Sequence, residues 1–145
     1  MNKRGFNSRR RSTRNGVAAL VAATACACVA TPASAFDINS FRAQHKLPPL
    51  SYSEAYAGAA QAHAYDLARR NHLDHNGFRE RMGALSSRAA ENVAYGCADA
   101  DCAYTMWARS AGHRRNMLMK GISSYGLADA VSASGRHYWV LELGN

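Results

Sequence analysis

Apolar and polar residues follow a different spacing in the first and last parts of this chain. Between residues 53 and 73, apolar residues recur every three or four positions, so that Tyr56, Ala60 and Leu67 share one face. That spacing is typical of a helix with one buried side. From residue 124 onward, apolar and polar residues alternate, as they do in half-buried strands. Helices followed by strands indicate an α+β fold.

Local signals set the limits of the other expected elements. Asp37 and Ser53 can cap helices, as can either Asp99 or Asp101, and Gly112 is expected to end the last long helix. The predicted helices cover residues 37–45, 53–73, 79–84 and 99–110, with a further turn at 114–119; the predicted strands cover 90–94, 124–131 and 136–143. The last two strands form a hairpin.

The first 35 residues differ in composition from the rest. Residues 1–14 carry six Lys and Arg and no acid, and residues 16–30 form an apolar run. Small residues at 32–35 supply a cleavage site, so we expect a signal peptide at 1–35 and one exported domain at 36–145. The apolar run is too short for a transmembrane helix, and none is expected in the domain. Export would place the domain in the periplasm or outside the cell.

Removing this segment changes what the charge implies. The whole chain has a formal charge of +8, but six of its 18 Lys and Arg lie in the first 14 residues. The remaining twelve are balanced by ten Asp and Glu, which leaves about +2. So small a charge does not indicate nucleic-acid binding, and we expect no nucleic-acid partner.

Cys97 and Cys102 are the two cysteines of the expected domain, separated by four residues. In an oxidising compartment a disulfide between them is the default, and two free thiols are the alternative. A bridge over so short a loop would stabilise the fold by about 2 kcal/mol if chain entropy dominates. A redox role is not indicated, because the spacing is not Cys-x-x-Cys and neighbouring aspartates would raise the thiol pKa values.

One acid, Glu91, lies inside the apolar run of residues 89–95. Burying a carboxylate is costly unless a partner compensates its charge. His113, which follows Gly112 and precedes two arginines, is a candidate partner. A carboxylate that meets an imidazole can bind a metal, transfer a proton or recognise a polar ligand.

Five motifs, in order, resemble the bacterial branch of the CAP (SCP/PR-1-like) superfamily. They are His75-Asn76-Gly77; Glu91-Asn92-Val93-Ala94; Trp107 with Ser110; Gly112-His113-Arg114 with Asn116; and Ser124-Tyr125-Gly126-Leu127-Ala128 with Tyr138-Trp139-Val140. The match covers nearly all of the chain after about residue 36. The resemblance implies the CAP-type α-β-α sandwich, a small antiparallel sheet flanked by helices.

The resemblance also implies a site. In the CAP family, two histidines and two acids face a common cleft, and the histidines can hold a divalent metal. Here His75 and His113 match the histidines, which makes them the candidate ligands of zinc or another divalent metal, and Glu91 matches one acid. Arg114 would flank the cleft and attract anions. A hydrogen-bonded structural cluster of the same side chains is the alternative.

The second acid of the family does not carry over. Its position, three residues after Trp107, is Ser110, which we interpret as a helix cap because no Gly-x-Ser-x-Gly motif surrounds it. Without a second carboxylate as base, a mechanism that uses a pair of acids is disfavoured. Of the other histidines, His63 is expected in the core, His72 at an exposed helix end, and His137 without a partner.

These residues favour a non-catalytic binding module over an enzyme. Its cleft, floored by His75, Glu91 and His113, would take a small molecule, a lipid or a peptide. The alternative is a metal-dependent hydrolase of the peptidase type, in which Glu91 is the catalytic base for a zinc-bound water. An envelope interaction protein without a ligand is also compatible, because the fold does not name a substrate.

Overall fold

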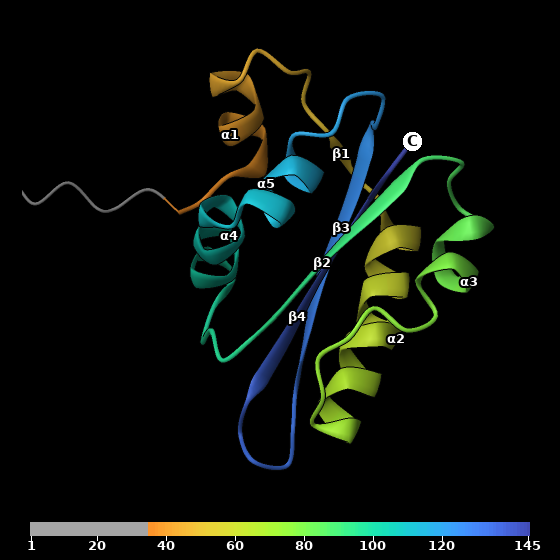
Figure 1. Cartoon of the computed structure of the whole chain (residues 1–145), viewed down its shortest axis with the longest axis vertical. Coiled ribbons are helices and arrows are strands. Elements are labelled where there is room, and N and C mark those ends of the chain that lie inside the picture. The colour runs from red at the N-terminus through yellow and green to blue at the C-terminus, as the bar shows by residue number, and fades with distance from the viewer. Residues whose placement is uncertain (1–34) are drawn as a thin grey trace, which may run out of the picture. The chain divides into compact units, whose positions relative to one another are not determined.

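The computed structural model describes residues 35–145 (Figure 1). The expected signal peptide, except for its last residue, therefore lies outside the described residues. The elements are α1 (Ile38–Gln44), β1 (Ser51–Tyr52), α2 (Glu54–Arg70), α3 (Phe78–Gly83), β2 (Ala89–Tyr95), α4 (Ala100–Arg109), α5 (Ala111–Met117), β3 (Ser124–Val131) and β4 (His137–Gly144). Within this part of the chain, no helix has the length and apolar character needed to cross a membrane.

The four strands form one sheet in the order β1-β3-β4-β2. The pairs β3–β4 and β4–β2 are antiparallel, as expected, with Leu127 and Asn92 both opposite Leu141. The short strand β1 was not predicted and pairs with β3 in parallel. The sheet is therefore mixed rather than purely antiparallel.

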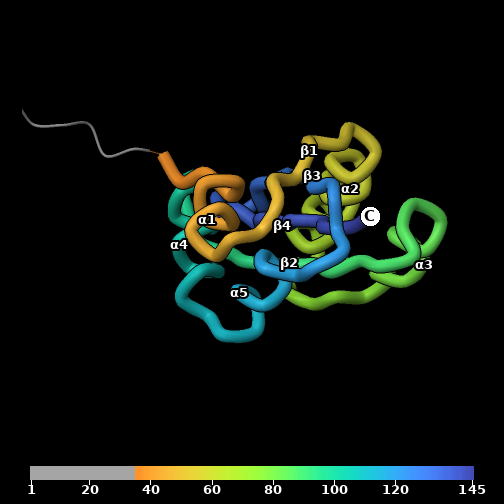
Figure 2. Tube along the Cα trace, turned by 90° about the horizontal axis from the view of Figure 1, so that it is seen from above, coloured from red at the N-terminus to blue at the C-terminus, as the bar shows by residue number. Residues whose placement is uncertain are grey.

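Helices cover both faces of the sheet. In Figure 1, α1, α4 and α5 lie on one side of the strands and α2 and α3 on the other, and Figure 2 shows the same separation from above. On the α2 face, Leu67 packs with Val93 and Val140; on the other face, Trp107 packs with Leu141. These are the three layers of the predicted α-β-α sandwich, which the structure confirms.

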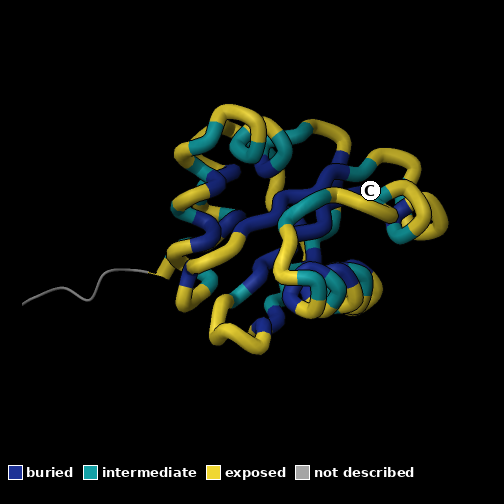
Figure 3. The backbone as a smooth tube through the Cα atoms, turned by 60° about the horizontal axis from the view of Figure 1, so that its bottom comes forward, coloured by how far each residue is buried: buried dark blue, intermediate teal, exposed yellow. Residues whose placement is uncertain are grey.

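Burial follows the same layers. In Figure 3, the strands in the middle of the molecule carry most of the buried residues, and the outer sides of the helices are exposed. The predicted face of α2 is buried, with Tyr56, Ala60, His63 and Leu67 all at most 4% exposed. Met106, on α4, is 41% exposed.

A glycine allows α2 to lie close to β3. A Cβ atom on Gly126 would collide with backbone atoms of Tyr56 and Ala57, at the first turn of α2. Backbone cannot move aside as a flexible side chain can, so only glycine fits here. This contact sets the height of α2 above the sheet.

Capping side chains fix the starts of three helices at predicted places. The side chains of Asp37, Ser53 and Asp99 accept hydrogen bonds from backbone N–H groups of α1, α2 and α4. The break between α4 and α5 falls at Ser110 rather than at Gly112, which lies inside α5. Ser110 takes the N-cap position of α5, but its side chain makes no capping hydrogen bond.

Candidate functional site

Glu91 and Glu142 face each other across β2 and β4, and β2 is an edge strand. The Glu91 carbonyl accepts a hydrogen bond from Asn116 Nδ2 at 3.1 Å. The Val93 carbonyl accepts one from Trp107 Nε1, also at 3.1 Å. Both carbonyls therefore point away from β4. Glu91 and Glu142 consequently form a non-hydrogen-bonded pair, the kind whose side chains lie closest together.

The Glu91 carboxylate is almost fully buried, with the residue 5% exposed. Its Oε1 atom lies 2.6 Å from His75 Nδ1, and its Oε2 atom accepts a hydrogen bond from Arg81 Nη2. His63 Nε2 lies 3.8 Å from the same Oε2 atom. The direct partners of Glu91 are therefore His75 and Arg81, and the prediction that His113 fills this role is wrong.

His75 lies in the loop between α2 and α3, and its side chain is 55% exposed. A carboxylate can only accept hydrogen bonds, so Nδ1 of His75 is the donor to Glu91. In the neutral imidazole this leaves the lone pair on Nε2 free. A carboxylate behind an imidazole is the arrangement that orients histidines as metal ligands.

Hydrogen bonds fix the loop that carries His75. Asp74 accepts a bond from Arg70 Nη1 at 2.7 Å and one from the Asn76 backbone N–H at 3.0 Å. The hydrogen bond from Arg70 lowers the pKa of Asp74 to about 2. Arg81 Nη1 donates to the Asn76 carbonyl at 2.5 Å. The arginine that binds the buried carboxylate therefore also holds the loop.

His113 lies on α5, on the opposite face of the sheet from α2. Its Nδ1 atom is buried and has no hydrogen-bond partner among residues 35–145. Burial, and then the nearby His75 imidazole, lowers the pKa of His113. A neutral imidazole with an unpaired nitrogen is suited to binding a metal or a hydrogen-bond donor.

Two asparagines hold α5 against the edge of the sheet. Asn92, on β2, donates to the His113 carbonyl at 3.1 Å. Asn116, on α5, donates to Asn92 Oδ1 at 2.9 Å as well as to the Glu91 carbonyl. The two asparagines thus join a strand to a helix, which places His113 at the same strand edge as Glu91.

Arg114 follows His113 on α5 and is half-buried. Its Nη1 atom donates to the Ala108 carbonyl at 3.0 Å, near the end of α4. Part of the guanidinium group is therefore used in joining the two helices. Its predicted role in attracting anions stays a prediction.

Glu142 was missed by the sequence analysis. It is fully buried on β4, and its Oε1 atom lies 3.5 Å from Arg81 Nε. Burial, followed by the neighbouring Glu91 carboxylate, raises the pKa of Glu142, while Arg81 acts in the opposite direction. A second carboxyl group is therefore present beside Glu91, but it keeps its proton at neutral pH. The signal was available: Glu142 is a single acid between two leucines on a predicted strand.

The contacts of Glu91 leave neither carboxylate oxygen without a partner. Both of its carboxylate oxygens are engaged, and Arg81 stabilises its charged form. Among residues 35–145, no set of three or more His, Cys, Asp and Glu side chains is arranged to hold a metal ion. The predicted donors are the two imidazoles of His75 and His113, so any metal there would need water or a ligand for its other positions.

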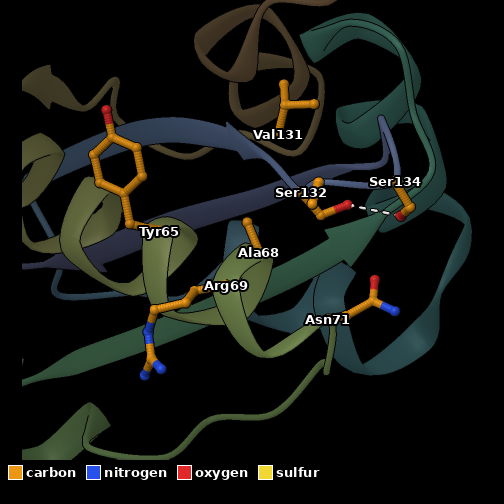
Figure 4. Close-up of a pocket in the computed structure, with 8 residues that line it drawn as sticks. Tyr65, Ala68, Arg69, Asn71, Val131, Ser132 and Ser134 are labelled. Carbon is orange, nitrogen blue, oxygen red and sulfur yellow. Dashed lines mark hydrogen bonds between the residues drawn. The ribbon is translucent and has the colours of Figure 1, made fainter.

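A pocket of about 450 Å³ lies elsewhere, between the end of α2 and the β3–β4 hairpin. Figure 4 shows Tyr65, Arg69 and Asn71 on the helix side and residues 131–134 on the hairpin side. Neither His75 nor Glu91 lines it. The expected cleft over the histidines stays a prediction.

The remaining cysteine and histidine predictions have mixed outcomes. Cys97 and Cys102 form the expected disulfide. His63 is buried and bonds the Asp74 carbonyl at 3.0 Å, as expected of a core residue. The side chain of His72 is 67% exposed, also as expected. His137 was expected to lack a partner, but its Nδ1 atom lies 2.7 Å from an oxygen of the Asp129 carboxylate.

Comparisons with known proteins agree with this architecture. The sequence profile of the family described as "CAP: Cysteine-rich secretory protein family" matches residues 36–143. A protein of Bacillus subtilis (strain 168), named "Uncharacterized membrane protein YlbC", is 28% identical over 99 residues. That alignment covers 61% of this chain and 28% of YlbC. The chain thus spans well under half the length of this relative.

Two solved structures share the fold. An outer surface protein from Borrelia burgdorferi superposes with a TM-score of 0.67 at 16% identity, over 74% of this chain and 86% of that one. An extracellular protein containing a SCP domain from Bacillus anthracis str. Ames gives a TM-score of 0.64 at 25% identity, over 74% of this chain and 37% of that one. At 16% identity, the first likeness concerns the fold alone.

Proposed function

This chain belongs to the CAP family of cysteine-rich secretory proteins, and from that premise we propose that it is an exported, non-catalytic binding module. His75 and His113 would hold a divalent metal such as zinc, and a small, lipid-like or peptide ligand would bind beside it. The expected signal peptide supports export. So does the similarity to a Bacillus anthracis protein that is described as extracellular.

The observation that carries this proposal is the buried carboxylate behind an exposed imidazole. Glu91 Oε1 accepts a hydrogen bond from His75 Nδ1 at 2.6 Å. The other ring nitrogen, Nε2, therefore points away from the carboxylate. The nearby His113 supplies a second, neutral imidazole. Two imidazoles fixed in advance lose little conformational freedom when they bind an ion.

The same contacts argue against hydrolysis. A general base must accept a proton from a reacting water, so it needs a free oxygen within hydrogen-bonding distance of that water. In Glu91, one oxygen is bound by His75 and the other by Arg81. Glu142, the second acid, is fully buried and keeps its proton. Neither acid is free to act as the base of a peptidase.

Zinc titration by calorimetry tests the proposal. Wild-type protein is expected to bind one Zn²⁺ per chain, and His75→Ala and His113→Ala are each expected to weaken binding at least tenfold, since each removes a ligand. His72→Ala is the matched control, because His72 is an exposed imidazole only three residues from His75. It should bind as the wild type does.

Two results would contradict the proposal. Wild-type protein that binds no Zn²⁺ would remove the metal site, and equal losses in all three variants would place the metal elsewhere. A third result would favour the alternative hydrolase: cleavage of a peptide library that chelation stops and Glu91→Gln abolishes. On our proposal, wild-type protein shows no such cleavage.

A further inference from the structure

Glu142 stands where a second buried charge would be destabilising. It faces Glu91 in a non-hydrogen-bonded cross-strand pair, and like charges directly opposite each other in a sheet repel. Both residues are at most 5% exposed, so water does not screen that repulsion. An apolar residue at position 142 would avoid the cost and would match its neighbours Leu141 and Leu143.

One arginine serves both carboxyl groups. Arg81 Nη2 donates to Glu91 Oε2, and Arg81 Nε lies 3.5 Å from Glu142 Oε1. The second oxygen of Glu142, Oε2, is buried and has no hydrogen-bond partner at normal distance and angle among residues 35–145. A single cation beside two acids leaves one acid to be neutralised in another way.

We propose that Glu142 is a positioning residue of the His75 site: paired with Glu91 and sharing Arg81 with it, its neutral carboxyl group holds the Glu91 carboxylate in the orientation that fixes His75. In this arrangement Glu142 shares its carboxyl proton with the Glu91 carboxylate that lies opposite it on the sheet, and Arg81, from α3, contacts both acids. Glu91 then presents its other oxygen to His75 Nδ1.

The surrounding ionisable groups agree with a charged Glu91 and a neutral Glu142. The groups in contact with Glu91 are His63 from α2, His75 from the following loop and Arg81 from α3, all hydrogen-bond donors. Within the described residues, Glu142 has Arg81 as its one cationic neighbour, at the longer distance. The negative charge therefore resides on Glu91, and burial together with Glu91 raises the pKa of Glu142.

The role of Glu142 in metal binding rests on the proposed function, but its role in orienting His75 does not. The neutral His75 ring should occupy a single tautomer, with the proton on Nδ1, whether or not a metal binds. Long-range ¹H–¹⁵N NMR spectra of the ring distinguish the two tautomers without any ligand. This readout also separates positioning from a purely structural contribution.

Two substitutions of Glu142 test whether its carboxyl group positions His75. Gln in Glu142→Gln keeps the size and a hydrogen-bond donor, so His75 should keep its single tautomer and Zn²⁺ affinity should stay within about twofold. Leu in Glu142→Leu keeps the approximate size and has no donor. There the His75 ring should populate both tautomers, and Zn²⁺ should bind at least tenfold more weakly, as is typical when a residue behind a metal ligand is lost.

The outcomes are distinct. A folded Glu142→Leu variant with an unchanged His75 tautomer would overturn the inference, as would a Glu142→Gln variant that behaves like Glu142→Leu. If neither variant folds, the ¹³C carboxyl signal of Glu142 in wild-type protein decides, because an ionised Glu142 at pH 7 excludes the proposed donor. Wild-type protein with a single His75 tautomer but no affinity for Zn²⁺ would refute the proposed metal site and leave this inference intact.

Discussion

The Glu91–Arg81–Glu142 cluster places two acids and one base in the interior. Glu91 is 5% exposed and Glu142 is fully buried, so each charge needs compensation. Arg81 compensates Glu91, to which it makes the shorter contact, and Glu142 retains a proton. A carboxyl group that is protonated in the folded state and ionised in the unfolded state makes stability depend on pH.

The pKa of Glu142 is raised from 4.5 to about 9. Between these values the folded chain binds one more proton than the unfolded chain, so this group's contribution to stability is complete below pH 4.5 and is lost as the pH rises towards 9. We expect the free energy of unfolding of wild-type protein to fall relative to Glu142→Gln by up to about 1.4 kcal/mol per pH unit in this window.

Urea denaturation at pH 6, 7 and 8 measures this difference. Glutamine does not titrate, so the variant is its own control for every other ionisable group. If the free energies of unfolding of wild type and Glu142→Gln change in parallel with pH, Glu142 is ionised in the folded protein at neutral pH, which contradicts the prediction.

Among the elements, the contact of α2 with β3 depends on small residues. Gly126 on β3 lies against the backbone of the first turn of α2, and alanines such as Ala60 and Ala64 continue the close approach along the helix. This packing positions the rest of α2, including His63 beneath Glu91 and the loop that carries His75. A change at Gly126 should therefore affect both stability and the site.

We expect Gly126→Ala to destabilise the protein by about 3 kcal/mol, the upper end of the usual range for overpacking, because the added methyl group meets backbone that cannot move aside. Gly58→Ala, on the helix α2 that Gly126 packs against, is the matched control. No atom lies within 4 Å of a Cβ placed there, so alanine should stabilise the helix by about 0.5–1 kcal/mol. Thermal and urea unfolding measure both. Equal effects of the two substitutions would refute the close approach.

Across the described domain, side chains from both helical layers reach the outer edge of β2. His75 and Arg81 come from the α2 and α3 side of the sheet, and His113 comes from α5 on the other side. Both layers can reach this edge because β2 is the outermost strand, and its outward-facing carbonyls accept hydrogen bonds from Asn116 and Trp107. On our proposal the two imidazoles approach each other around this edge, which an interior strand would prevent.

The disulfide stabilises one end of that edge strand. Cys97 follows β2 and Cys102 lies in the first turn of α4, so the bridge fixes the turn between them. Reduction with dithiothreitol should lower the free energy of unfolding by about 2 kcal/mol, as expected for so short a loop. The double variant Cys97→Ser, Cys102→Ser should show no response to the reductant. A wild-type stability that reduction leaves unchanged would contradict this prediction.

Patterns along the chain were enough to specify most elements and the family. Local hydrogen bonding fixes the helix starts at Asp37, Ser53 and Asp99, and alternating residues define the hairpin of β3 and β4. The five ordered motifs then indicated the sandwich. Residue spacing carries this information, because each of these features depends on residues only a few positions apart.

Which side chains meet in the site became clear only from the folded chain. Arg81 and Glu142 are 61 residues apart, and no local pattern links them. Their contact depends on the register of β2 against β4 and on the placement of α3 beside the sheet. The pairing of Glu91 with His75 rather than His113 has the same origin, since the partner of a buried charge is selected by the packing of distant elements and not by its neighbours in sequence.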